Sequence, residues 1–474
     1  MHHVEKIINK TIPLKMRTLT IIFLFSISSV FLLASCKKGI IENPDISVIV
    51  PGSGADTSKA PAPIVYKRTV NIGTGSGVLN FDGATFAVQC NDLIKIKGGS
   101  YTSINIKNVL SADGCPITFK NDGLVEVAGN FNAMSLENLK NVYISGDGTP
   151  GLAKGFSFRD NSYRAVVITG SLNNFTFQYA AFKNIGDLDI TFKYNDVYNG
   201  TEGSYSKNLR FLNMSCDNTA QFLTTGGYIQ GGVVYGLVKN IEIANIDFQN
   251  ASDVGTVVFM GNVEDYNIHH NKINNINTSN NNHNGIFQIA GNGRFHNNLV
   301  TNHQGNAIRA WGHTVGSTPK NILIYNNIVL NSRKYSGFEV QSFSDRITPG
   351  ITTYTNAIVF NNTCGNLNQS NDWQAAVVDV YGMSGGKVDV YNNLGFNFLP
   401  NQKMIALQWA EVIPNTSYNL YNETAAQDGI TDQTSLNLTS NSPAKSKGRP
   451  TPFVITDFYG KPRSATAPSI GAVE

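Results

Sequence analysis

Most of the chain consists of short runs in which apolar and polar residues alternate, and many of these runs carry asparagines. The clearest is KNILIYNNIVLN at 320–331. Its first half alternates as a strand does, two asparagines follow, a second apolar strand comes next, and an asparagine closes the unit. Weaker copies occur at 173–184, 207–218, 239–250, 264–275, 292–302, 356–366 and 387–397. A third apolar strand follows the copies, as at 285–290, 306–311, 337–342 and 376–381.

Each of these three strands is too small to bury its own face, so the strands of neighbouring repeats must stack on one another. The pattern therefore predicts an all-β chain, folded as a single-stranded right-handed parallel β-helix (a solenoid) over residues 64–474. Its coils are expected about 4.8 Å apart.

The closing asparagines are predicted to form a structural ladder. Asparagine tolerates the left-handed conformation that turns a corner, and stacked side-chain amides can bond to one another. The aligned positions are Asn184, Asn218, Asn250, Asn275, Asn302, Asn331, Asn366 and Asn397. Their spacings of 25 to 35 residues predict inserted loops after Asn331 and between Asn184 and Asn250, where repeat proteins usually build their functional face.

The cysteines divide into a pair and two single residues. Cys90 and Cys115 are 25 residues apart, about one coil, so a disulfide between neighbouring coils is plausible. Cys216 and Cys364 both align with Val329, an inward position. Because five coils, roughly 24 Å, separate them, they lie beyond disulfide reach and are expected to be buried free thiols.

The first 36 residues predict a targeting segment. Basic residues precede an apolar run at 19–33, and LASC at 33–36 resembles the lipobox of bacterial lipoproteins. That resemblance implies a signal peptide at 1–36, a lipid on Cys36, and an outer-membrane lipoprotein on the periplasmic or surface face of the cell envelope. Residues 37–63, rich in Gly, Pro, Ser and Ala, predict a flexible tether.

Charge narrows the choice of partners. The chain has 36 Lys and Arg against 33 Asp and Glu, which argues against nucleic acid. One position of the first strand places rings on the outside in successive coils, where they could stack on sugar faces. We expect this stripe either to bind polysaccharide or to be covered as a second core. Its members are His269, His296, Tyr325, Phe360, Tyr391 and, in the last coil, Tyr421.

A second outward column is expected on the third strands, containing Phe287, Arg309, Glu339 and Asp379. Carboxylates on adjacent coils would lie about 5 Å apart, the separation found in retaining glycosidases. A neighbouring arginine could instead bind a uronate. The alternative is an outward ion pair between Arg309 and Glu339 beside a solvated Asp379.

Two stretches of the sequence resemble parts of a known protein superfamily. DLIKIKGGSY at 92–101, followed by CPITFKN at 115–121, resembles the opening coils of the pectate-lyase-like superfamily of parallel β-helix proteins. The tail from 441 resembles the ending of β-helix lipoproteins from polysaccharide-degrading bacteria. The resemblance implies the fold over 64–474 and polysaccharide as the partner.

NAIRAWGH at 306–313 is similar to a motif of the alginate lyase and chondroitinase B family, which would make Arg309 the catalytic arginine. The preceding coil has Ala290 where that family has its lysine base, and it lacks the carboxylates that bind calcium. The resemblance implies β-elimination on a uronate glycan, with calcium as a possible cofactor and the base among His303, His313 and Lys334.

Three functions remain open from the sequence. The first is a lyase acting on an acidic glycan. The second is a glycoside hydrolase that uses Glu339 and Asp379. The third is a surface protein without catalysis, which either binds glycans or serves only as structure.

Overall fold

The computed structural model describes residues 64–129, 131–452 and 454–474, which all belong to one compact unit, Gly54–Glu474. The predicted signal peptide at 1–36, its lipidated Cys36 and the tether at 37–63 lie outside the described residues. Among the residues that are described, no helix is long and apolar enough to cross a membrane.

The described chain is almost entirely made of strands. Its first part contains β1 (Arg68–Ile72), β2 (Ser76–Asp82), the short helix α1 (Gly83–Phe86), β3 (Asp92–Leu110), β4 (Ile117–Ala128), β5 (Met134–Ser145), β6 (Phe156–Asn161), β7 (Arg164–Gln178), β8 (Ala180–Ile185), β9 (Leu188–Lys193) and the 3-10 turn η1 (Glu202–Ser204). The middle contains β10 (Ser206–Asp217), β11 (Gln221–Thr225), β12 (Tyr228–Gln230), β13 (Val233–Tyr235), β14 (Val238–Ala251), β15 (Val258–His269), β16 (Lys272–Ile276), β17 (Gly285–His296), β18 (Leu299–His303), β19 (Asn306–Trp311) and β20 (His313–Val315). The last part contains β21 (Asn321–Tyr325), β22 (Ile328–Ser332), β23 (Phe338–Ser342), the 3-10 turn η2 (Ser344–Arg346), β24 (Thr352–Tyr354), β25 (Asn356–Phe360), β26 (Thr363–Gly365), β27 (Ala376–Met383), β28 (Val388–Tyr391), β29 (Leu394–Phe396), β30 (Lys403–Gln408), β31 (Asn415–Ser417) and β32 (Leu420–Tyr421).

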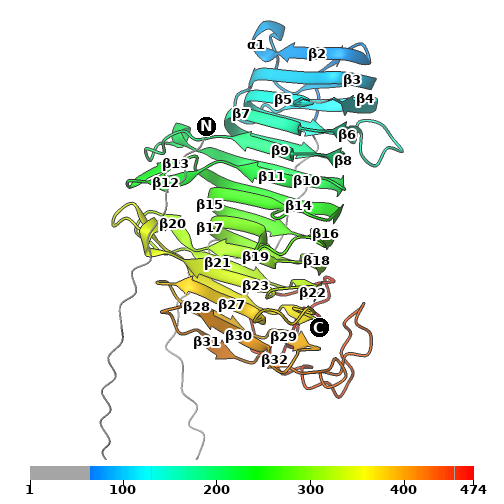
Figure 1. Ribbon diagram of the computed structural model, residues 1–474. Coiled ribbons are helices and arrows are strands. Elements are labelled where there is room, and N and C mark those ends of the chain that lie inside the picture. The colour runs from blue at the N-terminus through cyan, green and yellow to red at the C-terminus, as the bar shows by residue number, and fades with distance from the viewer. Residues whose placement is uncertain (1–63, 130, 453) are drawn as a thin grey trace, which may run out of the picture. The chain divides into compact units, whose positions relative to one another are not determined.

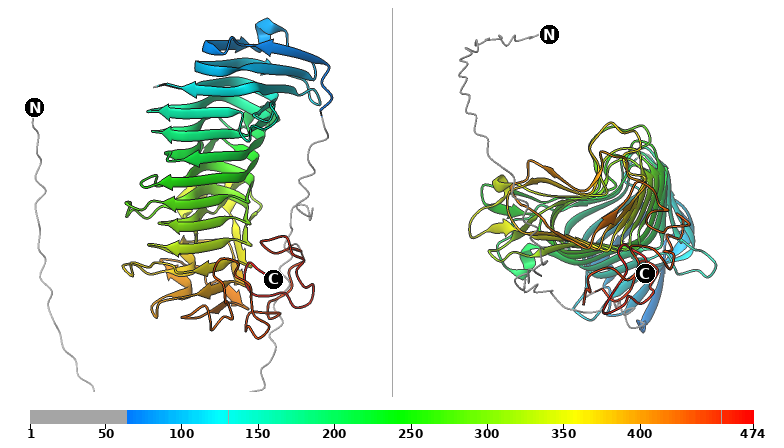
Figure 2. Two further views of the ribbon diagram at one scale, coloured as in Figure 1. Left: turned by 90° about the vertical axis from the view of Figure 1, so that its right-hand side faces the viewer. Right: turned by 90° about the horizontal axis from the view of Figure 1, so that it is seen from below.

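These strands form the predicted parallel β-helix, visible as stacked coils in Figure 1 and from the side in Figure 2. Three ladders of parallel pairs define three faces. The first face ends in β21, β25, β28 and β31. The second ends in β18, β22, β26, β29 and β32, and the third in β17, β19, β23, β27 and β30. The chain visits the three faces in turn, as the three-strand repeat predicted.

The predicted ladder of closing asparagines is confirmed. All eight have a positive φ of 51–61°, the left-handed turn conformation. Five side-chain amide bonds link neighbouring members directly, at 2.8–3.1 Å, as in Asn331 to Asn302 and Asn397 to Asn366. At two steps the amide instead bonds to the preceding residue of the neighbouring coil, Asp217 for Asn250 and Asn274 for Asn302.

A second asparagine ladder lies inside the solenoid, and four of its six members are the second asparagine of an NN pair. From Asn298 onward, each side-chain oxygen accepts from the backbone N–H and the amide of the asparagine one coil before it, as Asn362 does from Asn327 at 2.9 and 3.0 Å. Five of the six members are fully enclosed or nearly so. The ladder runs through Asn271, Asn298, Asn327, Asn362, Asn393 and Asn419. It satisfies polar groups that would otherwise be costly to bury.

The cysteines lie as predicted. Cys90 and Cys115 form a disulfide with a Cα–Cα distance of 4.6 Å. Cys216 and Cys364 are buried free thiols.

The two ends of the solenoid are closed differently. At the N-terminal end, Phe86 of α1 packs against Phe81 with their ring centroids 4.9 Å apart. At the other end, strands stop at Tyr421, and the rest of the chain folds back over the outside of the second face. There Ile470 and Val473 pack with Leu394 in a second hydrophobic cluster.

The inserted loops occur where the spacing predicted them. Between Asn184 and Asn250, β12 and β13 form an antiparallel hairpin. After Asn331, β24 pairs with β20 in a second small antiparallel sheet. The hairpin turn at Gly232 lies against Thr348 and Ile351, so both insertions project from the same side of the solenoid (Figure 1).

Candidate acid-pair site

The third face carries a column of polar side chains set by the strand register. Arg309 of β19 pairs with Glu339 of β23, and Glu339 pairs with Asp379 of β27. The predicted column is therefore correct for these three residues. It is wrong for Phe287, which is buried in the core, because β17 aligns Gln288 with Arg309.

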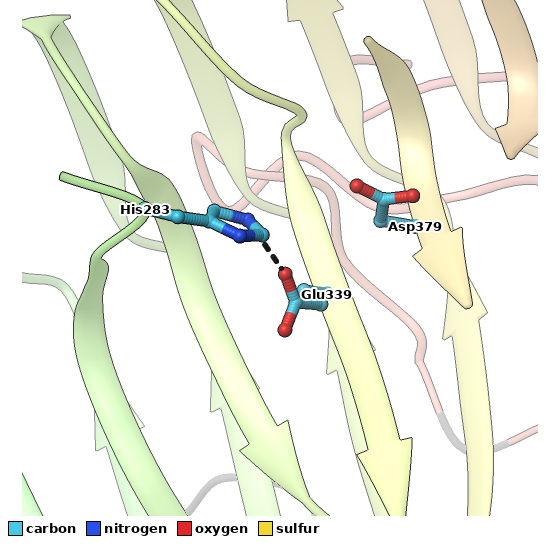
Figure 3. Close-up of side chains that lie close together, drawn as sticks. All are labelled: His283, Glu339 and Asp379. Carbon is cyan, nitrogen blue, oxygen red and sulfur yellow. Dashed lines mark ion pairs between the residues drawn. The ribbon is translucent and has the colours of Figure 1, made fainter. Parts of the chain in front are cut away.

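The column is joined by a histidine from a neighbouring loop, as Figure 3 shows. Arg309 Nε donates to Glu339 Oε1 at 2.7 Å. Glu339 Oε2 lies 2.9 Å from Nε2 of His283, with which it forms an ion pair when that ring is protonated. Asp379 completes the group, in which one ligand atom from each of His283, Glu339 and Asp379 lies within 4.8 Å of the others.

The two carboxylates sit in different surroundings. Glu339 faces the cation of Arg309, which stabilises its negative charge. Among the described residues, no lysine or arginine forms an ion pair with Asp379. Its oxygens accept from Ser336 Oγ at 3.0 Å and from Gln408 Nε2 at 2.9 Å. Burial, together with the charge of Glu339, raises the pKa of Asp379 to about 6. One carboxyl of the pair thus retains its proton well above the ordinary range of aspartate.

Two features hold the arginine and the histidine in place. A Cβ at Gly285 would lie 2.7 Å from Cβ and Cγ of Arg309, so the glycine leaves room for that side chain. Arg309 Nη1 donates to the backbone oxygen of His283 at 2.8 Å. The loop carrying His283 is also tied down by Arg333, which donates to Asn281 Oδ1 at 2.6 Å and contacts the backbone oxygen of Asn280.

Aromatic rings surround the carboxylates. The ring of Tyr335 stacks on His283 with centroids 4.4 Å apart, and Trp373 stands against Tyr335 at 5.5 Å. On the other side, Tyr381 is 5.9 Å from His283 and 5.1 Å from Trp409. Glu339 and Asp379 have no solvent-exposed surface, so this shell and Gln408 separate them from solvent.

The group could offer a metal ion three ligand atoms. One imidazole and two carboxylates suit zinc or manganese, whereas calcium prefers six to eight oxygen ligands. Glu339 Oε1 and both oxygens of Asp379 already accept hydrogen bonds. The cluster therefore fits calcium poorly, and we interpret it as an acid–base network.

The three residues expected as alternative bases are not gathered at the column. His303 and His313 are buried, and desolvation lowers the pKa of each to about 4. His313 is the first residue of β20, and its Nε2 is 3.2 Å from Asn262 Oδ1. Lys334 is near the site, but its Nζ is 3.0 Å from Asp372.

The predicted stripe of rings exists, but it is covered. Its members stack in register with centroids 4.6–5.1 Å apart. Four of the five are buried, and Arg449 of the C-terminal segment lies 3.7 Å above the ring of Tyr391. The structure therefore favours the expectation of a second core over sugar contact for His269, His296, Tyr325, Phe360 and Tyr391. Tyr421 lies outside the stripe, because Tyr391 pairs with Ser417.

Sequence reasoning missed His283 and the rings around the carboxylates. His283 is the one ionisable residue of the polar stretch NTSNNNHN at 277–284, between two strands. Trp373 and Trp409 are two of only three tryptophans in the chain. A search for rare aromatic or ionisable residues in loops next to the predicted column would have found all three.

The fold and the site together define a parallel β-helix protein with a buried acid pair on one face. No family model matches the chain, and no curated protein matches it. Several solved structures are similar in fold. Pectate lyase Pel9A is 13% identical, over 87% of this chain and 97% of its own, with a TM-score of 0.42. The PL6 family polysaccharide lyase Pedsa3628 from Pseudopedobacter saltans is 12% identical over 83% and 99%, with a TM-score of 0.38. XylC, solved with xylose, is 11% identical over 84% and 98%, with a TM-score of 0.40. Likeness at this level is one of fold alone.

Proposed function

We propose that the protein is a glycoside hydrolase acting on a polysaccharide, with Asp379 as the general acid and Glu339 as the nucleophile. The observation that carries this proposal is the pair of adjacent carboxyl groups in contrasting environments. The pKa of Asp379 is raised to about 6, while the cation of Arg309 stabilises charge on Glu339. A carboxyl group that keeps its proton beside a second carboxyl group is what acid catalysis at a glycosidic bond requires.

In the proposed reaction, Asp379 donates its proton to the glycosidic oxygen while Glu339 attacks the anomeric carbon. The bond to the leaving sugar breaks, and a glycosyl ester of Glu339 forms. Asp379, now ionised, then takes a proton from a water molecule that attacks the anomeric carbon and releases Glu339. Carboxyl groups on adjacent strands stand at about the 5 Å spacing of retaining enzymes.

The substrate must reach carboxylates that have no exposed surface. The side chain of Gln408 is only partly buried and bonds directly to Asp379. In this proposal the incoming glycosidic oxygen replaces the amide of Gln408 as the partner of Asp379.

A lyase, the first expectation from sequence, has less support. It needs a cation free to neutralise a uronate, and Arg309 is bonded to Glu339. Two of the expected bases, His303 and His313, are buried away from the column. Lys334, the third, already forms an ion pair with Asp372.

The test is to incubate the purified protein with neutral glycans and polyuronates, following both new reducing ends and the ultraviolet absorbance of unsaturated ends. We expect reducing ends without absorbance. Asp379→Asn and Glu339→Gln should each lower the rate by about 10²- to 10⁴-fold. Glu126→Gln, which alters a partly exposed ion pair with Arg159 on other strands, should leave the rate unchanged. Absorbance rising with the reducing ends would identify a lyase, and no product from any glycan would contradict enzymatic function.

We also propose that the protein works in the cell envelope, anchored by a lipid on Cys36. The LASC sequence at 33–36 supports this. Labelling of cells with a clickable fatty acid should mark the wild type and not Cys36→Ser. Equal labelling of both would contradict the anchor.

A further inference from the structure

An exposed tryptophan stands beyond the carboxylates on one side. Trp409 directly follows β30. In that strand Ala406 pairs with Asp379, so Trp409 lies three residues beyond the partner of Asp379 along the chain. Trp409 is 82% exposed and has a φ of 54°. A bulky residue in the left-handed region is uncommon, and such conformations cluster at functional sites. The backbone here presents a large ring to solvent beside the site.

A second tryptophan stands on the other side, in the loop before β27. Trp373 is 38% exposed and contacts His283, at 5.9 Å, as well as Tyr335. Tyr335 also has a positive φ, of 78°, and directly precedes Ser336, which bonds to Asp379. Because the strands are parallel, Trp373 lies toward their N-terminal ends and Trp409 toward their C-terminal ends. The carboxylates lie between the two rings.

The cations around these rings are already engaged. Arg309 contacts Glu339 and Lys334 contacts Asp372, while Arg333 donates to Asn281 Oδ1 and to backbone oxygens of the loop that carries His283. Lys334 also lies 5.4 Å from the ring of Tyr335. A glycan carrying carboxylates would have to break these ion pairs or meet the charge of Glu339. A neutral sugar can cover a tryptophan face without either cost.

We propose that Trp373 and Trp409 are sugar-stacking platforms on the two sides of the carboxylates, and that they bind a neutral polysaccharide which is cut within its chain. This rests on the proposed function for the position of the cleaved bond. The binding itself requires only the two rings. Sugar units on both sides of the acid pair are what an enzyme acting inside a chain must hold.

The experiment measures binding and turnover separately. In the Glu339→Gln background, isothermal titration would use neutral hexasaccharides of glucan, xylan and mannan type and a hexauronate. We expect a neutral hexasaccharide to bind, and Trp373→Ala or Trp409→Asn to weaken its binding by about 3- to 10-fold. Tyr418→Asn is the matched control for Trp409→Asn, because Tyr418 is also exposed, at 55%, and has a φ of 52°. It should bind like the parent.

The outcomes separate the two proposals. Three results would contradict the proposal that the two tryptophans bind a neutral glycan. These are wild-type affinity in both tryptophan variants, tighter binding of the hexauronate than of the neutral sugars, and no binding of any hexasaccharide. Products released only as single units from a chain end would overturn internal cleavage. Weakened binding in both tryptophan variants, with full turnover in Glu339→Gln, would keep the platforms and refute the acid pair.

Discussion

At the scale of single residues, the protonation of Asp379 decides what the site can do. Its pKa of about 6 arises from burial and from the charge of Glu339, and the hydrogen bonds from Gln408 and Ser336 oppose that shift. In its proposed role as general acid, Asp379 must carry its proton. We therefore expect kcat/KM to fall as pH rises through about 6.

Gln408→Ala should move that fall to higher pH. The amide of Gln408 favours the ionised form of Asp379, so its loss raises the pKa of the carboxyl. The measurement is the pH profile of kcat/KM for both proteins. Gln230→Ala, on the exposed β12 hairpin, is the control and should keep the wild-type profile. If the pH profile of Gln408→Ala is not shifted, a group other than Asp379 causes the fall in kcat/KM.

At the scale of elements, the two asparagine ladders look alike in sequence but contribute differently to stability. Asn327 is fully enclosed, donates to the backbone oxygen of Phe295 at 2.9 Å, and links Asn298 to Asn362. Asn331 turns a corner near the surface with a φ of 59°. Removing the first leaves several buried polar groups without partners. Removing the second exposes its neighbours to water.

Asn327→Ala should lower the free energy of unfolding by about 3 kcal/mol, because each buried orphaned group costs about 1–3 kcal/mol. Asn331→Gly should cost about 1 kcal/mol or less, because glycine adopts the same positive φ without strain. Urea denaturation of both variants and the wild type compares them. Equal losses would mean that the inner ladder contributes no more than the outer one.

The strand register explains which parts of the site could be predicted. The alternation of apolar and polar residues predicts which side chains point outward. An apolar residue directly precedes and directly follows each of Arg309, Glu339 and Asp379, so their outward direction could be predicted. Strand β17 has the same pattern, because Gln288 stands between Phe287 and Ile289 and pairs with Arg309. Alternation therefore indicated Gln288, and the prediction of Phe287 was displaced by one residue. Loops follow no period, so the position of His283 could not be derived.

At the scale of the whole molecule, the C-terminal segment changes the role of an entire face. Its Arg463 is almost fully enclosed and donates to Asn326 Oδ1 at 2.8 Å. Asn297 donates in turn to the backbone oxygen of Phe458, at 3.2 Å. These contacts join residues more than 130 positions apart, which no repeat alignment reveals. The stacked rings beside them are consequently a core, which leaves the third face as the proposed place for a ligand.

Acid should weaken the whole solenoid through its buried histidines. Burial lowers the pKa of His303 and of His313 to about 4, against about 6.5 in an unfolded chain. Above pH 6.5 both states are neutral and the fold keeps its full stability. As pH falls from 6.5 to 4 the unfolded chain gains protons that the folded chain does not, so stability is lost, by about 3 kcal/mol for each histidine. Asp379 acts in the opposite direction between about pH 6 and 4, because its folded pKa is raised.

The variant His303→Leu isolates one of these contributions. Its stability relative to the wild type should rise by about 3 kcal/mol between pH 7 and pH 4, because the variant has no imidazole to protonate on unfolding. Urea midpoints of the two proteins at pH 7, 5.5 and 4 measure this change. The exposed-loop variant Asn282→Leu, which also adds a leucine, should shift in parallel with the wild type at every pH. A pH-independent difference between His303→Leu and the wild type would mean that His303 binds its proton at the same pH in the folded and the unfolded chain, contrary to its burial.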